Sequence, residues 1–106
     1  MDYEITPQEL KQRHERNEEF VILDVREPWE RETARITPSL HIPMGDLPAR
    51  VQELDPEQHI VVYCHHGVRS LSVTDWLRKQ GYDKVQSVSG GIERWSLEID
   101  PKVPRY

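Results

Sequence analysis

Short blocks of apolar residues alternate with polar stretches along this chain of 106 residues. Two blocks, Phe20–Val25 and Ile60–Tyr63, are almost continuous aliphatic runs, a pattern typical of strands that are buried on both faces. Two shorter blocks, Leu40–Ile42 and Lys84–Val88, predict further strands. The polar stretches between these blocks then have to hold the connections of the fold.

Helical spacing and capping signals predict helices between the strands. Thr6 begins a capping box with Pro7 at the first helical position, which predicts a helix that ends near Asn17. Apolar residues at helical spacing, and a helix-ending Gly81, predict two more over Asp46–Leu54 and Ser70–Gln80. The remaining segments are a short helical or looped excursion over residues 27–32, a short helix after Gly90-Gly91, and a surface tail over residues 100–106. Strands that alternate with helices predict an α/β fold with a parallel sheet covered on both faces.

Composition narrows the class of protein. The length fits a single domain over residues 1–106. Fourteen Lys and Arg against nineteen Asp and Glu give a net charge of −5, which disfavours nucleic acid as a partner. The longest apolar run, near Ile60–Val62, is too short to cross a membrane, and the first residues lack the pattern of a secretory signal. We therefore expect a cytoplasmic protein. The three tryptophans, Trp29, Trp76 and Trp95, are expected to pack between helices and sheet.

The chain contains one cysteine, Cys64. A single cysteine excludes an internal disulfide, a CxxC redox pair and a cysteine-rich zinc site. Cys64 is therefore either a small buried hydrophobic residue or a working thiol.

The position of Cys64 favours a working thiol. It follows the strand that ends at Tyr63, and a helix is predicted to begin at Ser70. In this strand–loop–helix layout, backbone N–H groups and the helix N-terminus converge on a small anion, and Gly67 permits a sharp bend. We expect Cys64 to be largely thiolate near neutral pH, with Arg69 adding a positive charge that binds an anion. Arg69 fits poorly at a helix N-terminus unless an anion compensates for it.

Four other polar residues lie near the predicted site. His65 and His66 either donate hydrogen bonds to a ligand or only form the rim of the pocket. Neighbouring residues rarely converge on one ion, so we expect no metal site from Cys64 and the two histidines, and no cofactor. Asp24, at the end of the neighbouring strand, is expected to anchor the loop, while Arg26 pairs with a carboxylate or borders the pocket.

The sequence resembles the rhodanese-like family of sulfurtransferases, and single-domain thiosulfate sulfurtransferases in particular. No single motif identifies the family, but a set of motifs in the family's order along nearly the whole chain does. The motifs are Leu23–Pro28, His41–Met44, Ile60–Cys64, Gly67–Ser70, Leu77-Arg78, Gly81-Tyr82, Val85, Gly90–Ile92 with Trp95, and the ending from Asp100 to Tyr106. The chain departs from the family's usual Gly-His-Ile-Pro-Gly-Ala stretch, where it has residues 34–39.

The resemblance implies a three-layer sandwich with a five-stranded parallel sheet and helices on both faces. It also implies that Cys64 is the sulfur-carrying nucleophile and that a substrate loop surrounds it, made of His65, His66, Gly67, Val68 and Arg69. In that chemistry Cys64 takes the sulfane sulfur of a small anionic donor, thiosulfate or a persulfide, and is converted to a persulfide. A thiol, a protein acceptor or cyanide then removes the sulfur in a double displacement.

Two other functions remain open on the sequence. Related folds with a cysteine phosphatase or arsenate reductase activity place five residues between the cysteine and an arginine. Here four residues lie between Cys64 and Arg69, and Ser70 stands where that arginine would be. A non-catalytic interaction module with the same fold is the other alternative.

Overall fold

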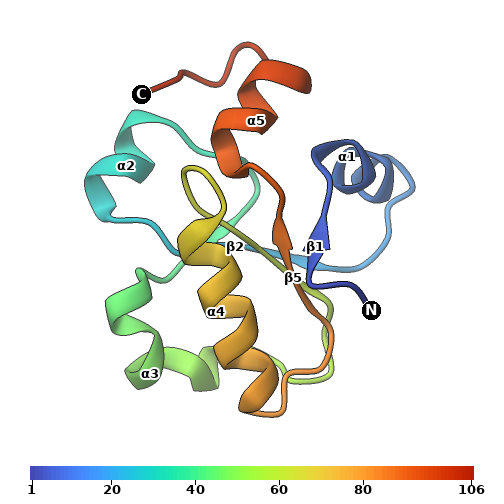
Figure 1. Ribbon diagram of the computed structural model, residues 1–106, viewed down its shortest axis with the longest axis vertical. Coiled ribbons are helices and arrows are strands. Elements are labelled where there is room, and N and C mark those ends of the chain that lie inside the picture. Colours follow the sequence, from blue (N-terminus) through green and yellow to red (C-terminus); the bar gives the residue numbers. More distant parts are fainter.

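A computed structural model describes all 106 residues and shows a five-stranded parallel sheet with helices on both faces (Figure 1). The strands are β1 (Glu4–Ile5), β2 (Val21–Asp24), β3 (Leu40–His41), β4 (Ile60–Tyr63) and β5 (Val85–Val88). Their order in the sheet is β1-β5-β4-β2-β3, and every neighbouring pair is parallel. The α/β fold and the parallel sheet that the sequence predicts are therefore confirmed.

The helices fill the connections between the strands. They are α1 (Pro7–Glu15), α2 (Pro28–Thr33), α3 (Leu47–Arg50), α4 (Val68–Lys79) and α5 (Gly91–Glu98), with 3₁₀ turns η1 (Met44–Asp46) and η2 (Val51–Glu53) on either side of α3. The predicted capping box is present, because the Thr6 hydroxyl accepts the Glu9 N–H at 3.1 Å and the Glu9 carboxylate accepts the Thr6 N–H at 3.4 Å. The helix predicted over Asp46–Leu54 is instead three short pieces, since Pro48 fits an α-helix only in its first turn.

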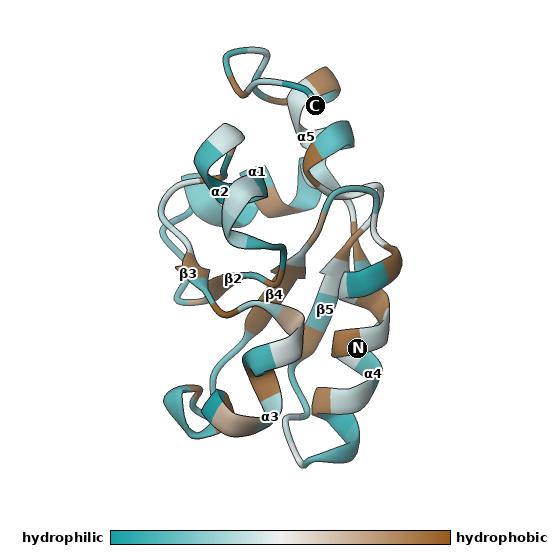
Figure 2. Ribbon diagram, turned by 90° about the vertical axis from the view of Figure 1, so that its left-hand side faces the viewer, coloured by the Kyte–Doolittle hydropathy of each residue, from teal (hydrophilic) through white to brown (hydrophobic).

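The alternation of side chains along β4 separates two apolar layers. Ile60 and Val62 point into one cluster with residues of α3 and α4, while Val61 and Tyr63 point into the other with residues of α1 and α5. All four residues of β4 are buried, as the unbroken aliphatic run predicts. Figure 2 shows the hydrophobic residues of β4 near the centre of the molecule, with hydrophilic residues on much of the outer helices and loops.

Two expectations differ from the structure, and one strand was not predicted. The strand β1 has only two residues, too few to give a sequence pattern, and it is held in place by pairing with β5. Trp29 is 61% exposed rather than packed between helix and sheet, because the α2 helix turns its Glu30 side chain inward instead. The tail does not simply follow the surface, since Val103 is buried in the layer that contains α5.

The candidate site lies where β2 and β4 end. Asp24 and Tyr63 are partners in the register of these two strands, so the segments that follow them leave the sheet at the same edge. No helix is both long and apolar enough to cross a membrane.

Candidate active site

Cys64 is the first residue after β4, and its sulfur is enclosed by the start of α4. The residue is only 1% exposed. Its Sγ accepts hydrogen bonds from the backbone N–H groups of Gly67, at 3.1 Å, and Ser70, at 3.3 Å. Backbone donors aimed at a sulfur atom stabilise negative charge on it, as the predicted loop cradle requires.

Two glycines allow the loop to fold this tightly. Gly67 has a φ of 106° and lies at the N-terminus of α4, in a region that other residues rarely adopt. Gly91 has a φ of 60° and brings α5 against the loop, so that the N–H groups of Ile92 and Glu93 donate to the carbonyls of Cys64 and His65. A Cβ atom at Gly91 would collide with both carbonyl oxygens. The Gly90-Gly91 pair therefore allows the start of α5 to hold the loop through these hydrogen bonds.

A pair of buried hydroxyl groups lies behind the sulfur. Ser70 Oγ is 3.3 Å from Cys64 Sγ and 2.7 Å from Ser87 Oγ, which comes from β5. Both serines are fully buried. The Ser70 hydroxyl can therefore accept a hydrogen bond from the Cys64 thiol and can donate one to the thiolate.

The guanidinium group of Arg69 is paired with a carboxylate of its own chain. Its two terminal nitrogens donate to the Glu30 carboxylate at 2.6 Å and 2.8 Å. Arg69, through these hydrogen bonds first of all, lowers the pKa of Glu30 from its ordinary value of 4.5 to about 2. The pKa of Arg69 is raised in turn, chiefly by Glu30. The anion that Arg69 needs at the helix N-terminus is thus supplied by α2.

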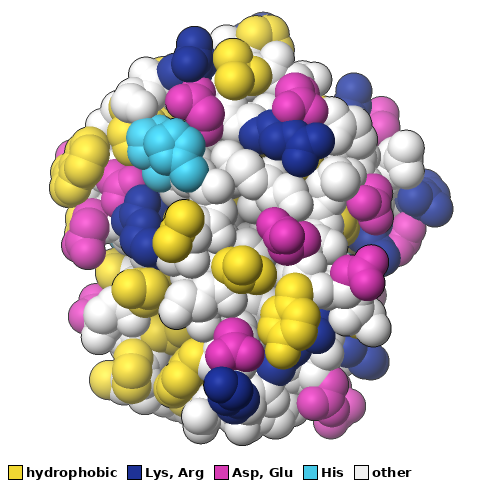
Figure 3. Space-filling model, in the orientation of Figure 1, with side chains coloured by type: hydrophobic (Ala, Val, Ile, Leu, Met, Phe, Trp, Pro, Cys, Tyr) yellow, Lys and Arg dark blue, Asp and Glu magenta, His cyan; other side chains and the backbone are white.

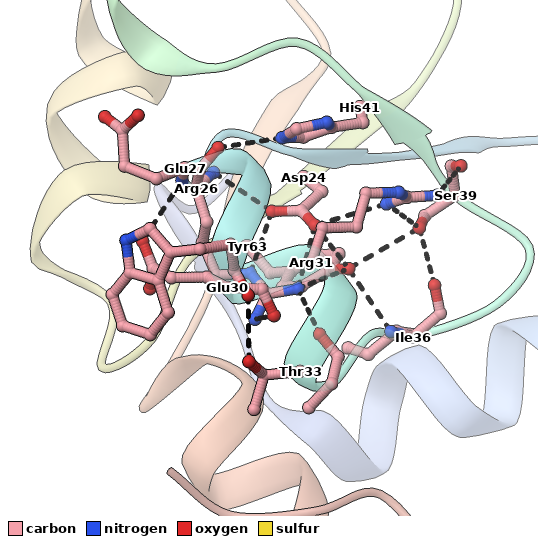
Figure 4. Close-up of polar contacts among 12 residues, drawn as sticks. Asp24, Arg26, Glu27, Glu30, Arg31, Thr33, Ile36, Ser39, His41 and Tyr63 are labelled. Carbon is pink, nitrogen blue, oxygen red and sulfur yellow. Dashed lines mark hydrogen bonds and ion pairs between the residues drawn. The ribbon is translucent and has the colours of Figure 1, made fainter.

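Asp24 and Arg26 form a buried pair at the end of β2 (Figure 4). Arg26 donates to both carboxylate oxygens of Asp24, at 2.9 Å and 2.8 Å, and the Tyr63 hydroxyl donates to the same carboxylate at 3.0 Å. Burial alone would raise the pKa of Asp24, but the hydrogen bonds and charge of Arg26 outweigh it, so the pKa is lowered. Arg26 also donates to the carbonyls of Glu30 and Ala34 and thereby fixes α2. This pairing agrees with the anchoring expected for Asp24 and with one of the two alternatives for Arg26.

The two histidines stack beside the loop. The His65 ring lies between those of His66 and Tyr106, with centroid distances of 3.9 Å to each. Burial, and then the charge of His66, lower the pKa of His65, and its Nε2 atom is buried without a hydrogen-bond partner. His66 is exposed, with Nε2 3.7 Å from a Glu93 oxygen.

The same residues are the candidates for a metal ion. Ligand atoms of His65, His66 and Glu93 all lie within 4.8 Å of one another. The planes of the two imidazole rings are only 19° apart in a stack. Imidazole nitrogens bind a metal in the plane of the ring, so the lone pairs of these two rings do not converge on one ion.

Three residues of the site were not found from the sequence. Glu30 and Tyr106 meet at 2.6 Å, where the tyrosine hydroxyl donates to the carboxylate, and Arg26 donates to the same hydroxyl at 2.9 Å. Burial and the hydrogen bond to Glu30 raise the pKa of Tyr106 to about 12. The third residue, Ser87, sits in a strand of mixed polarity. The sequence contained a signal only for Glu30, because Arg69 at a helix N-terminus requires a compensating anion.

Comparison with known proteins decides the family. The rhodanese-like domain family matches residues 6–98. The chain belongs to the rhodanese-like domain family. It is 38% identical over 99 residues to the putative sulfurtransferase YtwF of Bacillus subtilis, covering 93% of this chain and 95% of that protein. It is 39% identical over 77 residues to the thiosulfate sulfurtransferase GlpE of Coxiella burnetii, covering 73% of this chain and 72% of that protein.

Solved structures of the family share the fold. A rhodanese-like domain protein from Staphylococcus aureus superposes with a TM-score of 0.86 at 27% identity and covers 99% of both chains. A rhodanese-related protein from Thermoplasma volcanium gives a TM-score of 0.85 at 30% identity over 99% of this chain and all of that one. The rhodanese-like sandwich that the motifs imply is therefore confirmed.

Proposed function

We propose that the protein is a rhodanese-type sulfurtransferase, of the thiosulfate:cyanide sulfurtransferase class, which carries sulfur as a persulfide on Cys64. The observation that carries the proposal is the position of Cys64 Sγ under the N–H groups of Gly67 and Ser70 at the start of α4. Relatives named as sulfurtransferases, and one named as a putative sulfur carrier protein, support a role in sulfur transfer.

The first half-reaction moves sulfur to the enzyme. The Cys64 thiolate attacks the outer sulfur of thiosulfate or a persulfide, and a new S–S bond forms while the S–S bond of the donor breaks. Sulfite or a thiolate leaves with the electron pair of that bond. In the second half-reaction, a thiol or cyanide attacks the outer sulfur of the Cys64 persulfide and releases the Cys64 thiolate.

The surrounding residues take supporting roles in this proposal. The loop residues His65, His66, Gly67, Val68 and Arg69 bind the donor and the persulfide, mainly through backbone N–H groups. Asp24 and Arg26 hold α2 in place beside the loop. Phosphatase activity is not favoured, because the loop is short and the Arg69 guanidinium already faces Glu30.

Mass spectrometry of the intact protein tests the proposal. After incubation with thiosulfate or an organic persulfide, the mass should increase by one sulfur atom, and cyanide or a thiol reductant should remove it. Cys64→Ser should keep the fold and acquire no sulfur. Absence of the adduct with every sulfane donor would refute the proposed function, while an adduct that no acceptor removes would indicate a different role from transfer.

A further inference from the structure

We propose that this site selects sulfane donors that carry at most one negative charge, such as organic persulfides and thiosulfonates, over the dianion thiosulfate. The proposal rests on the proposed function and specifies its donor. It follows from the charged groups that surround Cys64.

Arg69 is the fixed cation of the loop, and it is already neutralised. Both of its terminal nitrogens are occupied by Glu30, and the Tyr106 hydroxyl donates a further hydrogen bond to that carboxylate. The pKa of Glu30, lowered to about 2 chiefly by Arg69, keeps this carboxylate charged near neutral pH. An incoming anion therefore meets an ion pair rather than a free guanidinium.

The other cations near the loop also have carboxylate partners. Arg26 is fully buried against Asp24, and Arg105 pairs with Glu93 at 2.5 Å. Burial lowers the pKa of His65, which favours its neutral form. A dianion therefore finds no unpaired guanidinium among these groups.

The surface beside the loop is acidic and apolar. A hollow of about 540 Å³ is lined by His66, Gly67, Val68, Leu71 and Ser72, together with the carboxylates of Glu4 and Asp75, and by no lysine or arginine. Val68, in the first turn of α4, is 79% exposed. Figure 3 shows acidic and basic side chains interspersed on this face, without a large basic patch. Such a surface accepts an organic group more readily than a second negative charge.

The balance of the reaction shows why the second charge matters. The Cys64 thiolate and thiosulfate together carry three negative charges, which the products, a persulfide anion and sulfite, also carry. With a protonated organic persulfide, R–S–SH, the reactants carry one charge, and the products are Cys64–S–SH and the thiolate R–S⁻. Like charges brought together in a site without a free cation raise the barrier.

Two matched donors test the selectivity. Thiosulfate and methanethiosulfonate both present an outer sulfane sulfur, but methanethiosulfonate carries one charge fewer. In the wild-type protein, kcat/KM for methanethiosulfonate should exceed that for thiosulfate. Glu30→Gln keeps hydrogen-bonding groups beside Arg69 while it removes the negative charge. It should raise the thiosulfate-to-methanethiosulfonate ratio of kcat/KM by about tenfold.

Glu53→Gln is the matched control, because it removes one charge from the exposed bidentate pair with Arg50. It should leave the donor ratio unchanged. The dependence of kcat/KM on ionic strength tests the same point without a variant. In the wild type, rising ionic strength should increase kcat/KM for thiosulfate more than for methanethiosulfonate. A wild-type preference for thiosulfate, or a donor ratio that Glu30→Gln leaves unchanged, would overturn the charge selectivity and leave the sulfur transfer intact. Failure of both donors to load Cys64 would overturn the proposed function itself.

Discussion

The hydroxyl groups of Ser70 and Ser87 lie 2.7 Å apart, and Ser70 stands between Ser87 and the sulfur of Cys64. Ser70 belongs to α4 and Ser87 to β5, so this contact joins the end of the loop that follows Cys64, called the reactive loop below (residues 64–70), to the sheet. When Cys64 is a thiolate, the Ser70 hydroxyl can donate a hydrogen bond to the sulfur and accept one from the Ser87 hydroxyl. A chain of two hydroxyl groups then stabilises the charge.

Ser87→Ala should therefore slow sulfur loading of Cys64 without moving the loop. We expect a decrease of about threefold to tenfold in the loading rate, because a donor to Ser70 is lost. Ser96→Ala, which removes a buried hydroxyl of α5 that donates to the Val103 carbonyl, is the control and should leave the loading rate unchanged. An unchanged loading rate in Ser87→Ala would contradict the role of Ser87 as a donor to Ser70.

Replacement of Glu30 should change how the protein responds to acid. The pKa of Glu30 is depressed from 4.5 to about 2 in the folded state, so its ionised form stabilises the fold. That stabilisation is complete above about pH 4.5 and is lost as the pH falls toward 2. Allowing for solvent screening at the partly exposed Arg69, we expect about 2 kcal/mol.

Urea unfolding of wild type and Glu30→Gln at pH 6 and pH 3 measures this contribution. The difference in unfolding free energy between the two proteins should be smaller at pH 3 than at pH 6. The exposed Arg50–Glu53 pair provides the control, since Glu53→Gln should show much less pH dependence. A difference independent of pH would contradict the assignment to the Glu30 charge.

The hydroxyl of Tyr106 should contribute to stability more than its place in the tail indicates. Tyr106→Phe keeps the ring stacked on His65 but removes the hydrogen bonds to Glu30 and Arg26. Because both partners are charged, we expect a loss of about 2 kcal/mol in the free energy of unfolding. Denaturant titration measures it, and a loss below about 0.5 kcal/mol would show that water replaces the hydroxyl.

A methyl group at Gly91 should disturb the reactive loop. Gly91→Ala places a Cβ atom against the carbonyl oxygens of Cys64 and His65, so the loop must move and sulfur loading should fall at least tenfold. Gly81 also has a positive φ, 97°, but nothing lies within 4 Å of the position that a Cβ atom would take there. Gly81→Ala should therefore cost only the backbone strain of about 1 kcal/mol and leave loading unchanged. Equal effects of the two substitutions would contradict the clash.

Local sequence patterns predicted the fold well because the sheet is built from local signals. The aliphatic runs at 20–25 and 60–63 and the capping box at Thr6 each act within a few residues. The two-residue strand β1 has no such signal, because pairing with β5 alone makes it a strand. The position of Cys64 between a strand and a helix was likewise readable from the chain.

The partners within the site were less predictable because they are distant in sequence. Arg69 was expected to need an anion, and the structure supplies one 39 residues away, in Glu30. Tyr106 joins the same carboxylate from 76 residues away. The exposure of Trp29 depends on this arrangement, because consecutive residues of a helix face different directions and Glu30 takes the inward position in α2. No periodicity within a single segment encodes such contacts.

The enclosure of Cys64 has a consequence for what an acceptor molecule encounters. The thiol is almost entirely covered, whereas an S–S bond is about 2 Å long. The outer atom of a Cys64 persulfide therefore stands one bond length beyond the atom that the protein conceals. In the proposed function, an acceptor would contact the transferred sulfur itself, and its removal would leave the Cys64 sulfur covered again. In the proposed function, loading would thus add a reactive atom to this surface and unloading would remove it.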